Sequence, residues 1–166
     1  MALRFLLTLA AAGWAAISSA QAQQVRPACS ENMRACAIRT ATLYLDGLVA
    51  HSSAKVPFAA DVRCTEQGRL YVEGEVKYRA ELDTSPPIIG RRNTRFYYDD
   101  KENQLFVWLL IDMMLPDPKD ETKKIQWTIH KTERFKIVGG FIKEVEILNV
   151  QKPGAVFDAA PWPDQH

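Results

Sequence analysis

The sequence predicts an α+β protein in which a strongly curved antiparallel sheet wraps around an N-terminal helix. One helical stretch with an apolar stripe lies early, at residues 33–51. Runs rich in β-branched, aromatic and aliphatic residues fill the second half, from residue 93 to residue 150, and turn signals separate them. Helices early and antiparallel strands late are typical of the α+β class. The length of 166 residues suits one domain.

Residues 1–22 have the composition of a secretory signal peptide. Arg4 precedes an uncharged apolar run of 13 residues, and the tripeptide Ala20-Gln21-Ala22 follows it. The run is shorter than the roughly 20 residues that span a bilayer, although a retained anchor or a buried helix is the alternative interpretation. We expect cleavage after Ala22, a periplasmic or extracellular location, and no stable membrane insertion afterwards.

The three cysteines leave the disulfide pairing open. An oxidising compartment would allow a disulfide bond. Cys29 lies in a polar lead-in, residues 23–30, and could pair with Cys36 at the start of the helix or with Cys64 in the body of the domain. Pairing of Cys36 with Cys64 is the third combination, and three unpaired thiols are the alternative to any bond. No Cys-x-x-Cys is present and the histidines are far apart, so no metal site is expected.

The first half of the chain contains the predicted helix and a less regular region. At 100° per residue one stripe of the helix at 33–51 is mostly apolar. Its members are Met33, Ala37, Ala41, Tyr44 and Leu48. A short strand is expected at 61–66 before a turn at Gln67-Gly68, then a short helix at 74–82 and a loop at 84–92.

The second half predicts two long hairpins. Strands at 93–99 and 104–114 are joined by the polar segment 99–103, and a turn is expected at 115–121. In the strand at 123–138, Ile125, Trp127 and Ile129 alternate with Gln126, Thr128 and His130. Gly139-Gly140 is a reversal before the last strand, 141–150. One domain is expected over residues 31–151, with an irregular Pro-rich tail at 152–166.

Charge and motifs exclude several functions. The chain carries 21 Lys and Arg against 20 Asp and Glu, so it lacks the positive field that attracts nucleic acid. It has no Gly-rich phosphate loop and no Gly-x-Ser-x-Gly, and these absences argue against nucleotide-dependent chemistry. Any reaction is expected to need no cofactor.

Three polar side chains are candidates for acid–base chemistry. Asp112 interrupts the apolar run 105–115; burial would raise its pKa, unless the strand has already emerged into solvent at that point. Tyr44 lies on the apolar stripe of the helix, where its hydroxyl could bind a substrate oxygen or a backbone carbonyl. His130 titrates in a useful range, but the alternation places it on a face expected to be solvent or a dimer surface.

Three segments resemble the SnoaL-like branch of the nuclear-transport-factor-2-like superfamily. They are YLDGLVAH at 44–51, VPFAADVRCTEQG at 56–68 and FKIVGGFIKEVE at 135–146. The resemblance covers roughly residues 31–151. The segment RLYVEGEV at 69–76 departs from the branch, in a region that normally borders the ligand pocket.

The resemblance implies a cone with a deep pocket in its mouth, and relatives that are either enzymes or binding modules. The first hypothesis is a cofactor-free isomerase, dehydratase or lyase for a small apolar or aromatic compound. Asp112 would move the proton, with His130 as a further candidate, and Tyr44 would polarise the substrate oxygen. Trp108, Trp127 and Tyr78 would form the apolar walls. The alternative is a non-catalytic ligand-binding or dimerisation module. The resemblance also implies a homodimer that pairs through the convex face of the sheet.

Overall fold

A computed structural model describes Cys29 and residues 33–151 of the chain. The predicted signal peptide at 1–22, the lead-in at 23–30 apart from Cys29, and the tail at 152–166 lie outside the described residues. The element bounds are α1 Met33–Ala50, β1 Phe58–Glu66, β2 Arg69–Glu73, α2 Glu75–Asp83, β3 Ile88–Asp99, β4 Gln104–Asp117, β5 Asp120–Val138 and β6 Phe141–Gln151. No helix in this part of the chain is long and apolar enough to cross a membrane.

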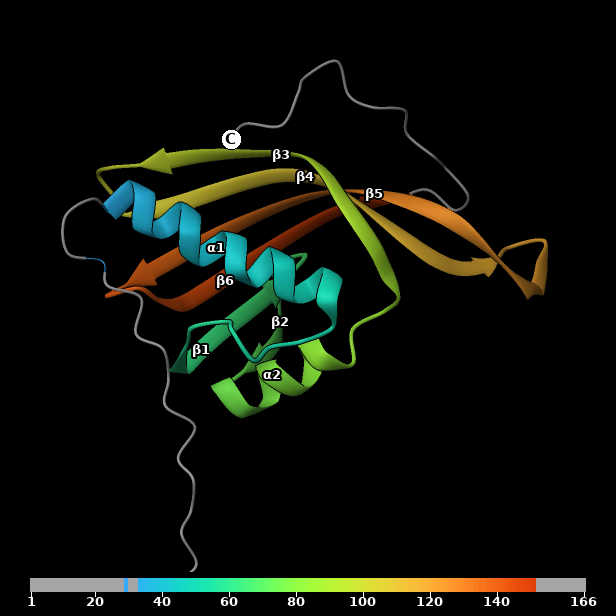
Figure 1. Ribbon diagram of the computed structural model, residues 1–166, viewed down its shortest axis with the longest axis horizontal. Coiled ribbons are helices and arrows are strands. Elements are labelled where there is room, and N and C mark those ends of the chain that lie inside the picture. Colours follow the sequence, from blue (N-terminus) through green and yellow to red (C-terminus); the bar gives the residue numbers. More distant parts are fainter. Residues whose placement is uncertain (1–28, 30–32, 152–166) are drawn as a thin grey trace, which may run out of the picture.

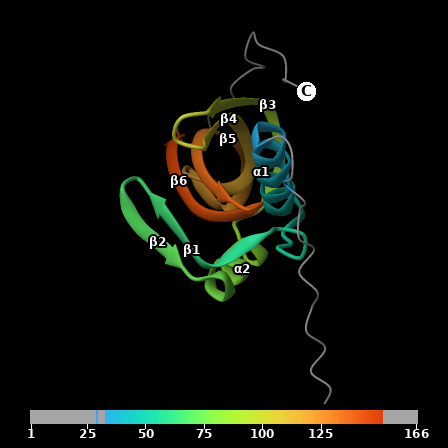
Figure 2. The ribbon, with the colours of Figure 1, turned by 90° about the vertical axis from the view of Figure 1, so that its left-hand side faces the viewer.

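The strands form one strongly curved sheet that closes around α1. Their order is β2-β1-β6-β5-β4-β3, and every neighbouring pair is antiparallel except β1 with β6. Seen along the helix, β3 to β6 curl around α1, while α2 lies at the β1 end of the sheet (Figures 1 and 2). The predicted α+β class with a curved sheet around an N-terminal helix is therefore confirmed.

The helix α1 supplies one side of the core. Its buried face includes Ala37, Ala41, Tyr44 and Leu48 of the predicted stripe, whereas Met33 at the first turn is 40% exposed. The face of the sheet turned toward α1, here called the inner face, contributes alternate residues of each strand. In β4 these are Leu105, Val107, Leu109, Ile111 and Met113. Apolar burial between the two layers is the main stabilising term of the fold.

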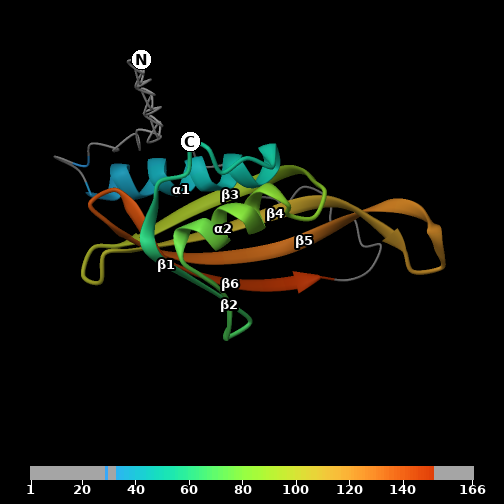
Figure 3. The same cartoon turned by 90° about the horizontal axis from the view of Figure 1, so that it is seen from below.

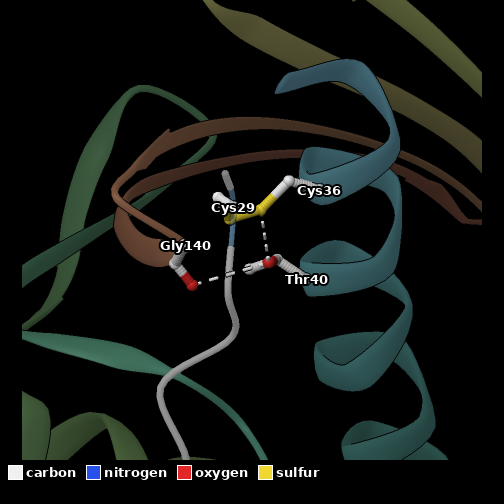
Figure 4. The surroundings of a disulfide bond; sticks show 4 residues. All are labelled: Cys29, Cys36, Thr40 and Gly140. Carbon is white, nitrogen blue, oxygen red and sulfur yellow. Dashed lines mark hydrogen bonds between the residues drawn. A yellow bond between two sulfur atoms is a disulfide. The ribbon is translucent and has the colours of Figure 1, made fainter. Parts of the chain in front are cut away.

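The disulfide joins Cys29 to Cys36 in the first turns of α1, and Cys64 is a free, buried thiol. Figure 4 shows the bond beside Thr40, whose hydroxyl contacts the carbonyl of Gly140 at 3.5 Å. The bond therefore holds Cys29 close to the turn between β5 and β6.

The structure corrects three of the predicted elements. A further strand, β2, follows the Gln67-Gly68 turn; only Val72 of this short edge strand is buried, so its sequence shows little alternation. The strand β3 begins at Ile88 inside the expected loop, because Gly90 and Arg91 pair with β4. The expected turn at 115–121 narrows to Pro118-Lys119, because Asp117 pairs with Asp120. The β4–β5 hairpin consequently extends beyond the rest of the sheet (Figure 3).

Candidate functional site

A cavity of about 220 Å³ lies between α1, α2 and the inner face of the sheet. We call it the inner cavity. Apolar side chains from both helices and from four strands, β3 to β6, make most of its wall. They include Leu48, Leu82, Ile111, Met113, Ile129 and Ile147. A cavity of this kind, largely apolar with a few polar groups, is typical of a small-molecule site.

Two buried tyrosines line the inner cavity and are hydrogen-bonded to each other. The hydroxyl of Tyr78 donates to the hydroxyl of Tyr44 over 3.1 Å. Tyr78 stacks on Phe58 with the ring centroids 4.5 Å apart, and Phe58 and Phe135 meet the Tyr44 ring edge to face. Burial raises the pKa of both tyrosines well above the ordinary value, and the charge of Glu133 raises that of Tyr44 further. Both phenols therefore remain protonated and can donate hydrogen bonds.

An ion pair lies on the inner face of β5, beside the tyrosines. Nζ of Lys131 is 2.7 Å from Oε1 of Glu133; the Lys131 side chain is 12% exposed and the Glu133 side chain 0%. Lys131 lines the cavity, whereas Glu133 lies behind the wall. Apart from this ion pair, neither oxygen of Glu133 has a hydrogen-bond donor among the described residues. Burying a carboxylate in this way is costly without a charged partner, so Lys131 is its required counter-ion.

The remaining polar groups of the inner cavity are the Ser85 hydroxyl, which is 3.1 Å from Nδ1 of His51, and two carboxylates with their donors. Tyr71 donates to Oε2 of Glu81 over 2.9 Å, and the Asn149 amide donates to Glu66. Both glutamates line the cavity. The Cys64 thiol is close to this group, but burial raises its pKa to about 12, so it is not a nucleophilic thiolate at neutral pH. No group of three potential metal ligands occurs in the described residues.

The structure divides the predicted site residues between the two faces of the sheet. Tyr44 and Tyr78 line the inner cavity. Trp127 is opposite Met113 in the β4–β5 pairing and so shares the inner face, but it does not line the cavity. Trp108 and His130 lie on the outer face, the one turned away from α1, and line a different hollow there. The predicted residues are therefore not one constellation.

Asp112 also lies on the outer face, and this corrects its expected environment. Arg92 Nε donates to its Oδ2 over 2.9 Å, and the Thr128 hydroxyl donates to Oδ1 over 2.6 Å. Burial raises the pKa of Asp112, but the hydrogen bonds from Arg92 and Thr128 outweigh it, and the net pKa is lowered. Asp112 is thus an ionised partner of Arg92 rather than an acid with a raised pKa. Its strand is apolar on both faces, so the sequence did not indicate which face it occupies.

Sequence reasoning missed Lys131 and Glu133, although a signal for them existed. The alternation that puts Trp127 and Ile129 on the inner face continues through residues 131 and 133 to Phe135. Two opposite charges at consecutive inward positions of a strand indicate a buried ion pair.

The fold defines a class: it is a cone with the fold of nuclear-transport-factor-2-like proteins, SnoaL-like proteins among them. The chain belongs to the family described as "Domain of unknown function (DUF8021)", which matches residues 30–148. A comparison with curated protein sequences finds no match.

Solved structures share the fold at low sequence identity. One is assigned as a SnoaL-like polyketide cyclase from Shewanella denitrificans, with TM-score 0.57 and 14% identity over 68% of this chain and 89% of that one. A second is the epoxide hydrolase/cyclase-like enzyme SalBIII, of pyran ring formation in salinomycin. Its TM-score is 0.53, with 14% identity over 68% of this chain and 89% of that one. A third is an NTF2-like protein of unknown function from Cytophaga hutchinsonii, with TM-score 0.50 and 12% identity over 72% of this chain and 100% of that one. At such identities the likeness concerns the fold alone.

Proposed function

We propose that the protein binds a small, mainly apolar compound carrying a carbonyl oxygen in the inner cavity, and catalyses a cofactor-free proton transfer on it. The observation that carries this proposal is the Lys131 ammonium, the one cationic group among the described residues that line the largely apolar cavity; it is paired with the buried Glu133. A fixed positive charge in an apolar cavity favours a ligand oxygen that gains negative charge.

The reaction class follows from the groups around the cavity. A carboxylate of Glu66 or Glu81 would take a proton from the carbon next to the carbonyl, and the electron pair would pass to the oxygen as an enolate. Lys131 would stabilise that oxygen. Tyr44, which accepts its hydrogen bond from Tyr78, has its own proton left to donate. Return of the proton at another carbon gives an isomer, and loss of a leaving group gives an elimination.

The named solved structures support an enzyme of this general kind. Two of them are called cyclases, and cyclisation, isomerisation and elimination share proton transfer next to an oxygen-bearing carbon. The alternative is a ligand-binding module without catalysis. It is favoured by the burial of Glu133, because the only carboxylate bases left among the described residues that line the cavity are Glu66 and Glu81.

We also propose an oxidising compartment, reached through the signal peptide expected at residues 1–22. The Cys29–Cys36 bond supports this location, because such bonds are rare where thiols are kept reduced. The intact mass of the protein recovered from a secreting host tests both parts. It should correspond to a chain beginning at Gln23 that has lost two hydrogens to the disulfide; an uncleaved or fully reduced chain would contradict the proposal.

Binding is tested with 2-acetylnaphthalene, an apolar fluorescent ketone. We expect saturable binding by the wild type and a loss of at least about tenfold in the double variant Lys131→Met/Glu133→Gln, because the charge that faces the ketone oxygen is gone. The double variant avoids leaving Glu133 buried without a partner. Lys101→Met, at an exposed turn, is the matched control and should bind as the wild type does. Equal binding by the double variant would refute the role of Lys131.

Catalysis is tested separately by deuterium exchange into the methyl group of the same ketone in D₂O, followed by proton NMR. Exchange above the buffer rate should depend on Lys131, and Glu66→Gln and Glu81→Gln identify the base. Binding without exchange would refute the enzyme and support the binding module. Absence of both would refute the inner cavity as a ligand site.

A further inference from the structure

A second hollow lies on the outer face of the sheet, away from the proposed active site. It has a volume of about 350 Å³ and is bounded by β3, β4 and β5. We call it the outer cavity. Asn93, Arg95, Trp108, Leu110, His130 and Thr132 are among its lining residues. Two of the residues predicted as functional from the sequence, Trp108 and His130, therefore meet here rather than in the inner cavity.

The strand register explains why these side chains converge. Arg95 is paired with Trp108, and Trp108 with Thr132, so the three form one row across β3, β4 and β5. Residues directly opposite each other on one face have their side chains side by side. In the next row Leu110 is paired with His130. Leu110 is only 3% exposed although it lies on the outer face, so the surrounding side chains enclose it and it forms the floor.

A bulge in β3 completes the wall. The pairing of β3 with β4 shifts between Arg92 and Arg95, and Asn93 has a positive φ of 56°. A bulge inserts one residue and re-aims its side chain, and bulges occur often beside functional sites. The Nδ2 atom of Asn93 is buried and makes no hydrogen bond with the described residues. It is a donor that a ligand oxygen could satisfy.

The charges around the outer cavity select the ligand. Arg92, in the neighbouring row, is already neutralised by Asp112. Arg95, His130 and Lys131 line the cavity, and none of its described lining residues is acidic; Lys131 is paired with Glu133. The Trp108 side chain is 51% exposed and meets Tyr97 edge to face at 5.5 Å, so a broad aromatic surface stands beside these cationic and donor groups.

We propose that the outer cavity is a binding site for a small aromatic carboxylate. The carboxylate would lie against the guanidinium of Arg95 and the amide of Asn93, since arginine holds carboxylates in a fixed fork geometry. The ring would pack on Trp108 and over Leu110, where apolar area and ring contacts contribute. This site differs from the proposed active site, because it opens on the other face of the sheet; among the described lining residues the two cavities share only Lys131.

The test uses 2-naphthoate, with the uncharged 2-naphthamide as its matched partner, in calorimetric titrations. All titrations are made in the Lys131→Met/Glu133→Gln background, because Lys131 lines both cavities and its ammonium could itself attract a carboxylate. We expect 2-naphthoate to bind, 2-naphthamide to bind at least about tenfold more weakly, and Arg95→Gln to remove most of that difference.

Trp108→Ala should weaken 2-naphthoate binding by about tenfold or more, since it removes the aromatic wall. Phe106→Ala is the matched control, because Phe106 is an exposed aromatic residue two positions away on the same face and does not line the cavity. In nitrogen–proton spectra the indole signal of Trp108 should shift on titration, while that of Trp127 on the inner face should not.

Three results would overturn the proposal. The first is equal binding of the acid and the amide, and the second is binding that survives both Arg95→Gln and Trp108→Ala. The third is a dimer in sedimentation experiments at the titration concentration that excludes 2-naphthoate and dissociates in Trp108→Ala. In that case a second copy of the chain, as expected for a homodimer, would cover this face instead of a ligand.

Discussion

At the scale of single residues, the stability of the fold depends on how its buried charges are neutralised. Glu133 is fully buried and, among the described residues, only Lys131 is paired with its carboxylate, so the stability of the fold depends on that pair. Asp112 is held by one arginine and one hydroxyl on the other face of the sheet. The stability of the protein should therefore depend measurably on the counter-ion of Glu133 and, through Asp112, on pH.

Lys131→Met should destabilise the protein by about 3–5 kcal/mol, because it leaves the Glu133 carboxylate buried without a counter-ion. Adding Glu133→Gln should recover most of this loss, since the charge disappears with little change in volume. Urea unfolding of the wild type, the two single variants and the double variant gives the coupling energy directly. Additive losses in the double variant would show that the two side chains do not depend on each other.

The Asp112 carboxylate should contribute stability above about pH 4 that is lost in acid. Its pKa in the folded protein is lowered below the unfolded value of about 3.9, so the ionised form favours folding above the unfolded value. The contribution disappears as the pH falls through the lowered folded pKa. Asp112→Asn should therefore lose stability at pH 7 and show a shallower decline below pH 4. Asp100→Asn, at an exposed turn, is the control; an identical acid profile for Asp112→Asn would contradict the prediction.

At the scale of elements, the packing of α1 against the loop that follows it depends on one glycine. A Cβ built on Gly47 would lie 2.9 Å from the backbone oxygen of Ser52 and 2.9 Å from Cγ2 of Val56. The amide of Ser52 donates to the carbonyl of Gly47 over 3.0 Å, so the chain cannot easily move away. This contact holds the end of α1, which carries Leu48, in place beside Leu82 of α2. Both leucines line the inner cavity.

Gly47→Ala should therefore destabilise the protein by about 1–3 kcal/mol through steric overlap, even though alanine is the better helix former by about 1 kcal/mol. Thermal unfolding of the variant measures the sum. Gly90→Ala, where a Cβ would meet no atom within 4 Å, is the matched control and should change little. A stabilised Gly47→Ala variant would show that helix propensity outweighs the overlap.

The elements were predictable where local patterns are strong. The apolar stripe from Ala37 to Leu48 and the alternation around Trp127 are local, and α1 and β5 follow them. The start of β3 was not predictable, because Ile88 to Arg92 are extended only by pairing with β4, in spite of the glycine among them. The strand β2 has the same cause: it exists because β1 offers an edge, not because its own sequence alternates.

At the scale of the whole molecule, the site could be predicted only in part. The inward direction of the Tyr44 side chain could be predicted, because the apolar stripe of the helix determines which way it points. Asp112 and Trp108 were not, since β4 is apolar on both faces and only the pairing with β3 and β5 shows which side each residue takes. The curvature that separates an inner from an outer cavity is likewise a property of the complete sheet (Figure 2).

The Cys29–Cys36 bond should stabilise the whole domain by about 2 kcal/mol, the value expected for a short loop when the unfolded chain is constrained. Cys29→Ser/Cys36→Ser should lose this amount in urea unfolding, and dithiothreitol should lower wild-type stability by the same amount. The reductant should not affect the double variant, because its remaining Cys64 forms no disulfide. Equal stability of oxidised and reduced wild type would contradict the prediction.

The parallel pairing of β1 with β6 has a consequence for the order of assembly. During synthesis β1 is complete long before β6, yet on the side away from β2 Cys64 and Thr65 pair with Val145 and Glu146 of that last strand. Loop-closure entropy for this contact is incurred before any of its stabilisation is gained, which slows folding. One edge of the β1–β2 hairpin therefore stays unpaired until β6 has been synthesised. During that interval the nascent domain is most exposed to strand pairing with another chain.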